Sequence, residues 1–311
     1  MTTFYPEGIL SRSKSNTENL KSPASIQEAM QKKTPLEARA AVCDSDHNLI
    51  VDLGFMKGII PREECAIGIS DGSTRDIAII SKVNKPVSFY VTDIKKDQNG
   101  SPFAVLSRRL LQERCREEYI NKLLPGDIIH GKVTHLESFG CFVDIGCGII
   151  SLIPIDAISI SRISHPRDRF AVGQDILAVV KSFDEQGKIC LTHKELLGTW
   201  EENAEQFTPG ETVAGVIRSI ENYGIFVELA PNLAGLAELK ENVKVGQHAS
   251  VYIKSLIPEK MKIKLIIVDH FDADYPRHGY HYYVTSPHID YWKYSPDCAE
   301  KQIETLFQPE E

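Results

Sequence analysis

The alternation of apolar and polar residues in this chain repeats at a fixed spacing. The stretch 131–145 returns at 215–229, 84 positions later, with matching residue types. Each copy sets alternating apolar residues beside two rings that flank a glycine, Phe139-Gly140-x-Phe142 and then Tyr223-Gly224-x-Phe226. A repeat at constant spacing indicates one structural unit used more than once. The alternation predicts twisted strand pairs that present rings on an open face of a sheet.

Turn residues and charged stretches divide the chain into β-rich segments joined by helices. Ser, Asn, Lys and Thr dominate the first 24 residues, which predicts disorder there, followed by a short helix at 25–30 that Pro35 ends. Short strands at close spacing favour small barrels over parallel βαβ units. The predicted parts are a leader at 1–36, a first β domain at 37–108, a linker helix at 109–124, a second β domain at 125–194, a linker helix at 195–208, a third β domain at 209–269 and an aromatic-rich C-terminal extension at 270–311.

Composition narrows the class of protein. The formal net charge of −8 argues against a protein that coats nucleic acid through overall positive potential, although a local basic strip is compatible with it. Seven cysteines with no CxxC spacing argue against a disulfide framework or a four-cysteine zinc site, and favour reduced thiols. No apolar run approaches the ~20 residues that span a bilayer. We therefore expect a cytoplasmic protein without membrane contact.

Side-chain parity within the second β domain predicts which residues face outward. Val143 and Ile145 suit a barrel interior, so Phe142 and Asp144 should lie on the outer face. Gly140 permits a bulge that brings the other ring beside Phe142. The alternative is that these aromatics are core. It is weakened by the recurrence of the ring pair and by the aliphatic residues available on the opposite parity.

Exposed rings beside cations form a stacking platform for single-stranded nucleic acid. Lys181, late in one predicted strand, and Lys188, at the start of the last strand, supply the charge. Base stacking on such rings contributes ~1–3 kcal/mol per base. The second domain is therefore predicted to be the main site for RNA.

Two stretches of the second domain resemble the S1 RNA-binding domain, a five-stranded OB-fold. They are Val133-x-x-Leu136-x-x-Phe139-Gly140-Cys141-Phe142-Val143-Asp144-Ile145-Gly146 and Asp184-Glu185-Gln186-Gly187-Lys188-Ile189-Cys190-Leu191-Thr192. The resemblance is good over the third domain, weak over the first and absent from the extension. It implies a mainly β chain of three tandem OB-fold domains, each an S1-type five-stranded barrel, joined by short helices.

The resemblance also implies which residues contact RNA. In the family the RNA face uses two aromatics, a polar residue after the third strand, and an Asp and a basic residue around the last hairpin. The implied residues are Phe139, Phe142, Asp184 and Lys188 in the second domain, and Tyr223, Phe226 and Lys262 in the third, with Lys254 as a further cation there. The family's frequent histidine falls on Pro154 and Glu238.

The first domain has His47 and Ile50 where the rings should stand. It is expected to keep the fold and to lose the platform. Within the family, such a degenerate leading repeat often docks on protein rather than on RNA, so the small ribosomal subunit is the expected target.

The second domain also carries a basic loop that the third lacks. Phe139 and Lys188 are 49 positions apart, whereas Tyr223 and Lys262 are only 39 apart. Arginine-rich loops can clamp phosphates, and a solvated loop without function is the alternative. The loop at 159–169 adds three candidate RNA-binding residues, Arg162, Arg167 and Arg169.

The extension holds the one arrangement suggestive of metal or catalysis, His278-x-x-His281 followed by His288 and Asp290. Convergent ligands on a rigid scaffold are not evident in so short an aromatic stretch. We expect it to pack against the third barrel and to close with a helix after Ser295-Pro296-Asp297. No catalytic residue, metal or cofactor is predicted.

The sequence thus favours a non-catalytic, monomeric bacterial protein, either ribosome-associated or free, that holds single-stranded RNA, mRNA in particular, in translation. An RNA-binding accessory factor of an RNA-processing or other enzyme is the first alternative. A protein-interaction adaptor whose barrels have drifted from RNA is the second. The first domain fits the adaptor, but the second domain does not.

Overall fold

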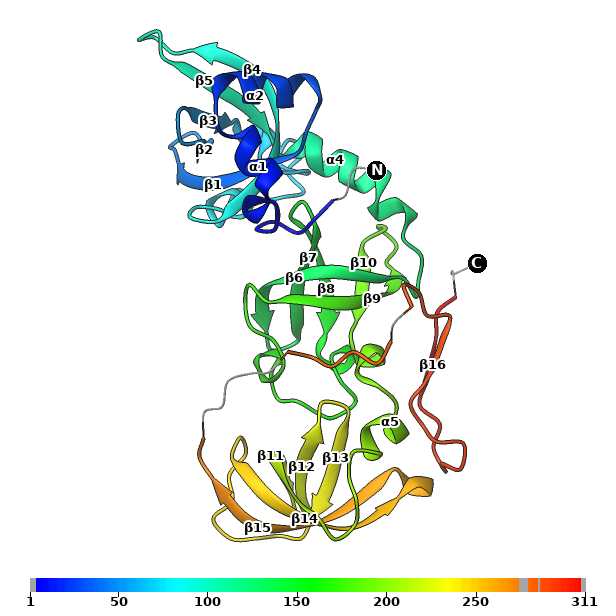
Figure 1. Ribbon diagram of the computed structural model, residues 1–311. Helices are drawn as coiled ribbons and strands as arrows, with labels where there is room; N and C mark the ends of the chain where they lie inside the picture. The colour runs from blue at the N-terminus through cyan, green and yellow to red at the C-terminus, as the bar shows by residue number, and fades with distance from the viewer. Residues whose placement is uncertain (1–3, 274–278, 285, 309–311) are drawn as a thin grey trace. The chain divides into compact units, whose positions relative to one another are not determined.

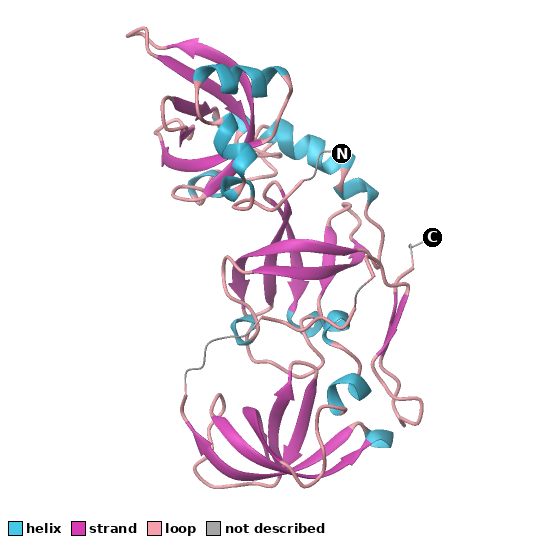
Figure 2. Ribbon diagram, in the orientation of Figure 1, coloured by secondary structure: helices cyan, strands magenta, loops and turns pink. Residues whose placement is uncertain are grey.

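The fold of this chain is mainly β, with three closed five-stranded barrels in succession (Figures 1 and 2). The computed structural model describes residues 4–273, 279–284 and 286–308. The prediction of three tandem OB-type barrels is confirmed. Among these described residues, no helix is both long enough and apolar enough to cross a membrane.

The three barrels share one topology. In each, the first three strands form a meander, the fifth strand pairs with both the third and the fourth, and the fourth returns to the first. The parallel pairing of the third with the fifth strand closes the sheet, so no edge is left open to aggregation. The strands are β1 Leu36–Cys43, β2 Leu49–Asp52, β3 Lys57–Ile60, β4 Pro86–Lys96 and β5 Pro102–Ser107; β6 Ile128–Glu137, β7 Gly140–Gly146, β8 Ile149–Pro154, β9 Asp175–Phe183 and β10 Ile189–Thr192; β11 Thr212–Glu221, β12 Gly224–Ala230, β13 Leu233–Ala237, β14 His248–Ile257 and β15 Lys262–Phe271.

Alternation along the strands fills the barrels with aliphatic side chains. Val143 and Ile145 are fully buried, as the parity of β7 predicts. On β12 the matching residues are Val227, which is also fully buried, and Leu229, which is partly buried against the core. Asp144, expected on the outer face in water, is buried instead. Its carboxylate accepts hydrogen bonds from three backbone amides, which replace the water that an exposed acid would bind.

The leader is ordered from residue 4 onward, so the prediction of disorder up to about residue 24 is wrong. The Asn16 side chain forms a pair of hydrogen bonds with the backbone of Glu37, at 2.8 and 2.9 Å, and is itself buried. Phe4 and Ile26 are also buried. Composition suggested disorder, but these long-range contacts outweigh it. The leader's helices are η1 Leu10–Arg12, α1 Lys14–Asn19 and α2 Pro23–Gln31.

The linker helices form where charge and turn residues predict them. The first is α4, Arg109–Glu118, which is followed by η3, Ile120–Lys122. The second is split into η6, Lys194–Leu197, and α5, Trp200–Ala204, because Gly198 at φ 83° leaves the helical region. The remaining short helices are η2 Arg62–Glu64, α3 Ile77–Ile80, η4 Ile155–Ala157, η5 Pro166–Asp168 and η7 Pro258–Lys260.

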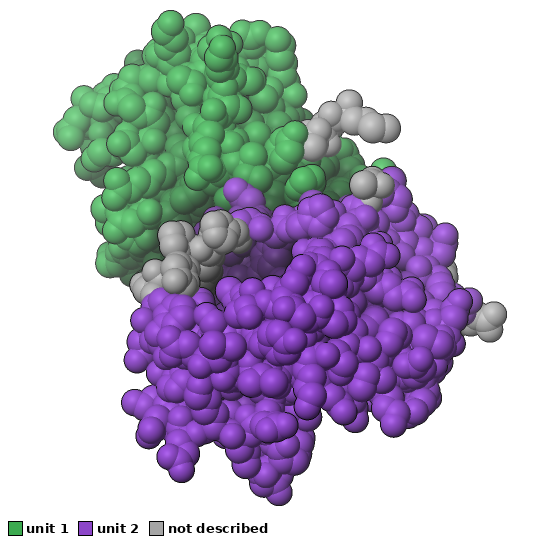
Figure 3. All heavy atoms as spheres, turned by 60° about the horizontal axis from the view of Figure 1, so that its bottom comes forward, with its two compact units in different colours: residues 1–123, 130–132, 144–150 green, residues 124–129, 133–143, 151–311 purple. Residues whose placement is uncertain are grey.

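Packing divides the chain into two compact units (Figure 3). Unit 1 comprises residues 1–123, 130–132 and 144–150, and unit 2 comprises 124–129, 133–143 and 151–311. The β7–β8 hairpin at 144–150 therefore belongs to unit 1 although its strands complete the second barrel. The limits predicted for the individual domains stay predictions.

The extension differs from its prediction in two ways. Within its described residues it ends in a two-stranded sheet, β16 Tyr291–Lys293 with β17 Glu304–Leu306, and residues 296–303 carry no helix. It also packs on the second barrel as well as the third. The backbone of Pro287 and Ile289 bonds to that of Ile128 and Gly126.

An aromatic box fixes the extension to the second barrel. His193 meets the rings of Tyr280 and Tyr282 edge-on, at centroid distances of 4.8 and 5.7 Å, and Phe170 meets Tyr280 edge-on at 5.9 Å. Burial lowers the pKa of His193 to about 4, so the imidazole is neutral at physiological pH. The box therefore supplies apolar contact without a charge.

We predict that Trp292→Ala destabilises the protein by about 3–5 kcal/mol, as for other buried Trp and Phe truncations. Trp292 is only 6% exposed and belongs to the core cluster that contains the interior of the third barrel. Urea denaturation measures the loss. The matched control is Tyr291→Ala, whose neighbouring ring is 48% exposed. Equal losses in the two variants would show that the extension contributes no core.

Candidate nucleic-acid interface

The ring pair of the second barrel lies on its surface. Phe139 occupies the turn between β6 and β7 and is 54% exposed, and Phe142 on β7 is half-buried. Their centroids are 6.0 Å apart and the ring planes meet at 88°. Gly140 lies between them, and a Cβ there would stand 2.6 Å from the Ile153 carbonyl oxygen. Only glycine lets the strands approach this closely, and that approach holds both rings at one corner of the sheet.

A third ring extends this surface, and the sequence did not reveal it. His135 on β6 lies 6.2 Å from Phe142, with the ring planes tilted by 34°. Its Nε2 is 2.6 Å from Glu137 Oε1, and the side chain is exposed. The family pattern directed attention to Pro154 instead. The 84-residue repeat could have found the position, since it matches His135 to the polar Ser219.

The third barrel repeats the same geometry. Tyr223, 66% exposed, and Phe226 have centroids 6.1 Å apart and planes at 89°. Gly224 again allows close approach, because a Cβ there would lie 2.6 Å from the Ala237 carbonyl oxygen. Two barrels therefore present the same edge-to-face ring pair, as the spacing of the repeat predicts.

In the third barrel, strand register places Phe226 in a row of paired residues that runs through all five strands. We call the five residues of this row the platform row. It includes a cation, Lys264, that sequence reasoning missed and that stands where the second barrel has Cys190. Successive pairings join Ser219 on β11, Phe226 on β12, Leu236 on β13, Lys264 on β15 and Ser255 on β14.

In the first barrel, four of the five positions of the same row are aliphatic, and the fifth is Asp93. Ile50 takes the place of the ring, and His47 sits in the turn before β2 at φ 62°. Val42, at the start of the row, is 52% exposed. This surface suits apolar contact better than base stacking. The row runs through Val42, Ile50, Ile59, Val105 and Asp93.

Of the predicted cations, each barrel has one within its fourth strand and one at the hairpin that leads into the fifth. All four are exposed and two stand on each barrel, namely Lys181 and Lys188 on the second and Lys254 and Lys262 on the third. Asp184, predicted to contact RNA, has a structural role in the same hairpin. Its Oδ1 accepts the backbone N–H groups of Gln186 and Lys188, at 2.9 and 2.8 Å.

The arginines of the 159–169 loop divide into two kinds. Arg162 and Arg167 are exposed and remain candidates for phosphate contact. Arg169 is 3% exposed at its side chain and donates to Glu228 at 2.5 Å. The prediction that Arg169 clamps phosphates is therefore wrong, because its guanidinium is buried and already paired. Its partner lies 59 residues away in the sequence, and local charge patterning cannot reveal it.

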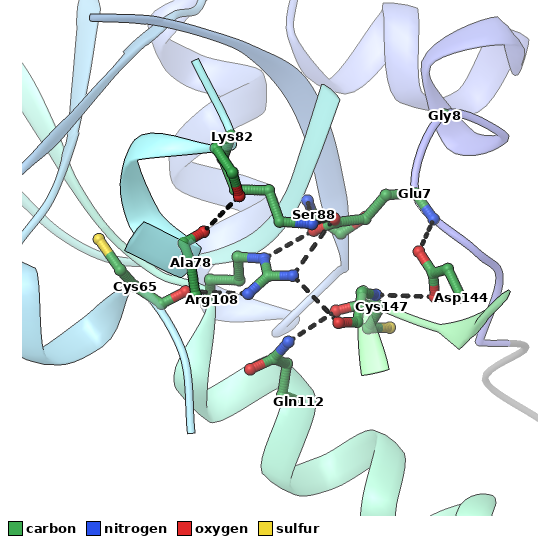
Figure 4. Close-up of polar contacts among 12 residues, drawn as sticks. Glu7, Gly8, Cys65, Ala78, Lys82, Ser88, Arg108, Gln112, Asp144 and Cys147 are labelled. Atoms are coloured by element: carbon green, nitrogen blue, oxygen red, sulfur yellow. Dashed lines mark hydrogen bonds and ion pairs between the residues drawn. The ribbon is translucent and has the colours of Figure 1, made fainter. Parts of the chain in front are cut away.

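A buried polar network in unit 1 surrounds the β7–β8 hairpin (Figure 4). Arg108 Nε donates to Glu7 Oε1 at 2.6 Å, and Lys82 Nζ donates to Glu7 Oε2 at 2.7 Å. The backbone N–H of Glu7 donates to Asp144 Oδ2 at 2.8 Å, and Gln112 donates to the carbonyl of Cys147 at 3.0 Å. Asp144 stands two residues beyond Phe142 on β7.

The pKa values of the two acids in this network, Glu7 and Asp144, are shifted in opposite directions. Burial alone raises the pKa of Glu7, but attraction to Arg108 and Lys82 outweighs it and brings the pKa down to about 2. Burial raises the pKa of Asp144 to about 6, and the neighbouring Glu7 carboxylate adds to the rise. Glu7 is therefore the charge that the network stabilises.

The histidines of the extension do not converge in the described residues. His278 lies outside those residues. The ring centroids of His281 and Tyr283 are 4.6 Å apart. His288 points to two acids instead, with its Nδ1 2.7 Å from Asp127 Oδ1 and its Nε2 3.3 Å from Asp290 Oδ1. Within the described parts of the chain, no group of three or more His, Cys, Asp or Glu could hold a metal ion.

Comparison with known proteins finds a family match over the second barrel. Residues 122–194 match the S1 RNA binding domain family. The chain is 29% identical over 276 residues to the small ribosomal subunit protein bS1 of Staphylococcus aureus, covering 83% of this chain and 67% of that protein. It is also 29% identical to the bS1 homolog of Bacillus subtilis, covering 71% of this chain and 56% of that protein. The chain thus resembles bacterial ribosomal protein S1.

Among solved structures, a multidomain protein with nucleic acid binding domains from Streptococcus pneumoniae can be aligned with this chain. The alignment covers 76% of this chain and 73% of that protein's chain. The alignment has 13% identity and a TM-score of 0.25.

We predict that Glu7→Gln destabilises the protein in a pH-dependent way. The folded pKa of Glu7 is about 2 against an ordinary 4.5, so its charge stabilises the fold above pH 4.5. That contribution falls as the pH drops from 4.5 towards 2. The difference in unfolding free energy between variant and wild type should be about 3 kcal/mol at pH 7 and should shrink towards zero near pH 2.

Urea denaturation at pH 7, 4.5 and 2.5 measures this difference. Glu28→Gln is the matched control, since Glu28 is exposed on α2, where it pairs with the equally exposed Lys32. A cost of Glu7→Gln that stays constant from pH 7 to 2.5 would contradict the assignment of Glu7 as the stabilising charge.

Proposed function

We propose that this chain is a non-catalytic RNA-binding protein that holds single-stranded RNA, in particular mRNA, on the ring pairs of its second and third barrels. The observation that carries the proposal is the exposed edge-to-face pair Phe139–Phe142, with a matching pair on the third barrel. Stacking suits unpaired bases, whose faces are free. The match of residues 122–194 to the S1 RNA binding domain supports the same ligand.

The surroundings of the rings fit RNA rather than an apolar partner. Exposed lysines stand on the hairpin of each barrel, and Lys264 joins the platform row of the third. Arg162 and Arg167 add charge on the loop of the second barrel. Few phosphates are neutralised by so small a set, so binding should weaken with salt less steeply than for a strongly basic protein.

The setting we propose is translation in the cytoplasm, with the protein acting as a monomer on the small ribosomal subunit. The similarity to bS1 proteins supports this setting. The first barrel is the docking module in this scheme, because its row presents the aliphatic Val42 and has Ile50 in place of a ring. An enzyme would need a separate catalytic domain, usually with clustered carboxylates for metal ions, and the three barrels occupy most of the chain.

Phe142→Ala should weaken binding of a single-stranded RNA oligonucleotide by ~1–3 kcal/mol without unfolding the protein, because the ring contributes affinity rather than core packing. Combining it with Phe139→Ala should nearly abolish binding by the second barrel. Fluorescence anisotropy with single-stranded and duplex RNA of one sequence measures both the loss and the preference for unpaired bases.

Val172→Ala is the matched control, since it truncates an apolar side chain that is 64% exposed in the turn before β9. Intact affinity in Phe142→Ala together with a large loss of thermal stability would show that the rings are core. Equal or tighter binding of the duplex would contradict the proposed ligand.

Val42→Glu should reduce co-sedimentation with small ribosomal subunits several-fold while leaving oligonucleotide affinity within about two-fold, because a charge in the aliphatic row opposes apolar contact. Ile77→Glu is the control, as Ile77 is 65% exposed on α3 and lies outside that row. Loss of oligonucleotide binding in Val42→Glu, with co-sedimentation intact, would reverse the proposed roles of the barrels.

A further inference from the structure

The 159–169 loop is anchored to the third barrel by a buried ion pair. Arg169 Nη2 donates to Glu228 Oε2 at 2.5 Å, to the Pro231 carbonyl at 3.2 Å and to Ser159 Oγ at 3.3 Å. Both charged side chains are at most 9% exposed. A buried charge that loses its partner costs several kcal/mol, so these groups stay together in the folded protein.

A second arginine makes the pair part of a chain of alternating charges. Arg218 donates from Nε to Glu228 Oε2 at 2.9 Å and from Nη2 to Oε1 at 3.1 Å, and its Nη1 lies 3.6 Å from Asp168 Oδ1. Glu228 therefore keeps a partner on its own barrel when Arg169 is removed. The chain Asp168–Arg218–Glu228–Arg169 crosses twice between the loop and the third barrel.

Asn232 adds an uncharged clamp at the same place. Its Oδ1 accepts the Ile160 N–H at 2.9 Å, and its Nδ2 donates to the carbonyls of Lys194 and Gly198 at 2.8 and 3.0 Å. Its own carbonyl accepts the Tyr294 hydroxyl at 2.5 Å. One buried residue thus ties the loop, the linker and the extension to the third barrel.

These contacts adjoin the ring of the third barrel. Glu228 stands two residues beyond Phe226 on β12, and Arg218 directly precedes Ser219, the residue that pairs with Phe226. The second barrel has an acid at the same repeat position, Asp144, which is also bound by an earlier segment of the chain. In both copies of the repeat, the acid next to the ring is thus bound by an earlier segment of the chain.

We propose that the Arg169–Glu228 and Asn232 contacts join the second and third barrels into one rigid unit whose two ring pairs bind a single RNA strand together. This rests on the proposed function and assigns Arg169 a positioning role. A strand held by one barrel meets the other ring pair at a high effective concentration, so affinity gains without any new contact. Rigidity also lowers the ordering cost of binding, because the spacing is set beforehand.

Arg169→Ala in the full-length protein tests this by its dependence on RNA length. One single-stranded RNA of about 8 nucleotides fits a single OB fold, and one of about 24 exceeds it. Wild type should bind the longer RNA at least 10-fold more tightly. The variant should lose about 10-fold on the longer RNA and stay within two-fold on the shorter, with its salt dependence unchanged.

Arg162→Ala is the matched comparison, because it removes an equal charge from an exposed position of the same loop. Loss of this exposed charge should make the salt dependence of RNA binding shallower. Asn232→Ala is the second variant and should show the length-selective loss of Arg169→Ala without any change of charge. Thermal unfolding checks that each variant is folded.

Three outcomes would overturn the inference. They are an Arg169→Ala loss that is equal on both RNAs, a shallower salt slope that matches Arg162→Ala, or an unchanged preference for the longer RNA in both Arg169→Ala and Asn232→Ala. Failure of wild type to bind either RNA would refute the proposed function itself. The two failures are therefore distinguishable.

Discussion

Both ring-bearing barrels hold a buried carboxylate next to a stacking ring. The surroundings of each ring depend on the hydrogen bonds that this carboxylate accepts. Asp144 and Glu228 occupy the same repeat position, two residues beyond Phe142 and Phe226, and both are buried. A buried acid must be hydrogen-bonded or paired. In one barrel the leader's backbone supplies the partner, and in the other Arg169 does. The alternation of side chains along the strand turns the rings outward. The partners of the two acids determine which segments of the chain lie next to the rings.

The features that the sequence predicts correctly are local ones. The parity of Val143 and Ile145 follows from the period of a strand, and the ring-glycine-ring unit needs only neighbouring residues and one close approach. The second copy of this unit, 84 positions later, argues against the alternative that the rings belong to the barrel core. Barrel topology and exposure of Phe139 were therefore predictable, although RNA contact by these residues stays a prediction.

The features that were missed depend on partners far away in the sequence. Arg169 looked like a phosphate ligand because its loop is basic, but Glu228 lies 59 residues later and removes it from the surface. The leader looked disordered by composition, yet Asn16 binds the backbone of Glu37. Lys264 was missed because only strand register brings it into line with Phe226.

That lysine makes the two ring-bearing barrels electrically unequal. The second barrel has Cys190, an uncharged thiol, where the third has an ammonium group in the middle of its platform row. The exposed cations of the second barrel lie instead outside that row, on β9, on the β9–β10 hairpin and on the 159–169 loop. Under the proposed function, a strand on the third barrel would therefore meet a positive charge and a ring within one row, whereas a strand on the second barrel would meet them on separate elements.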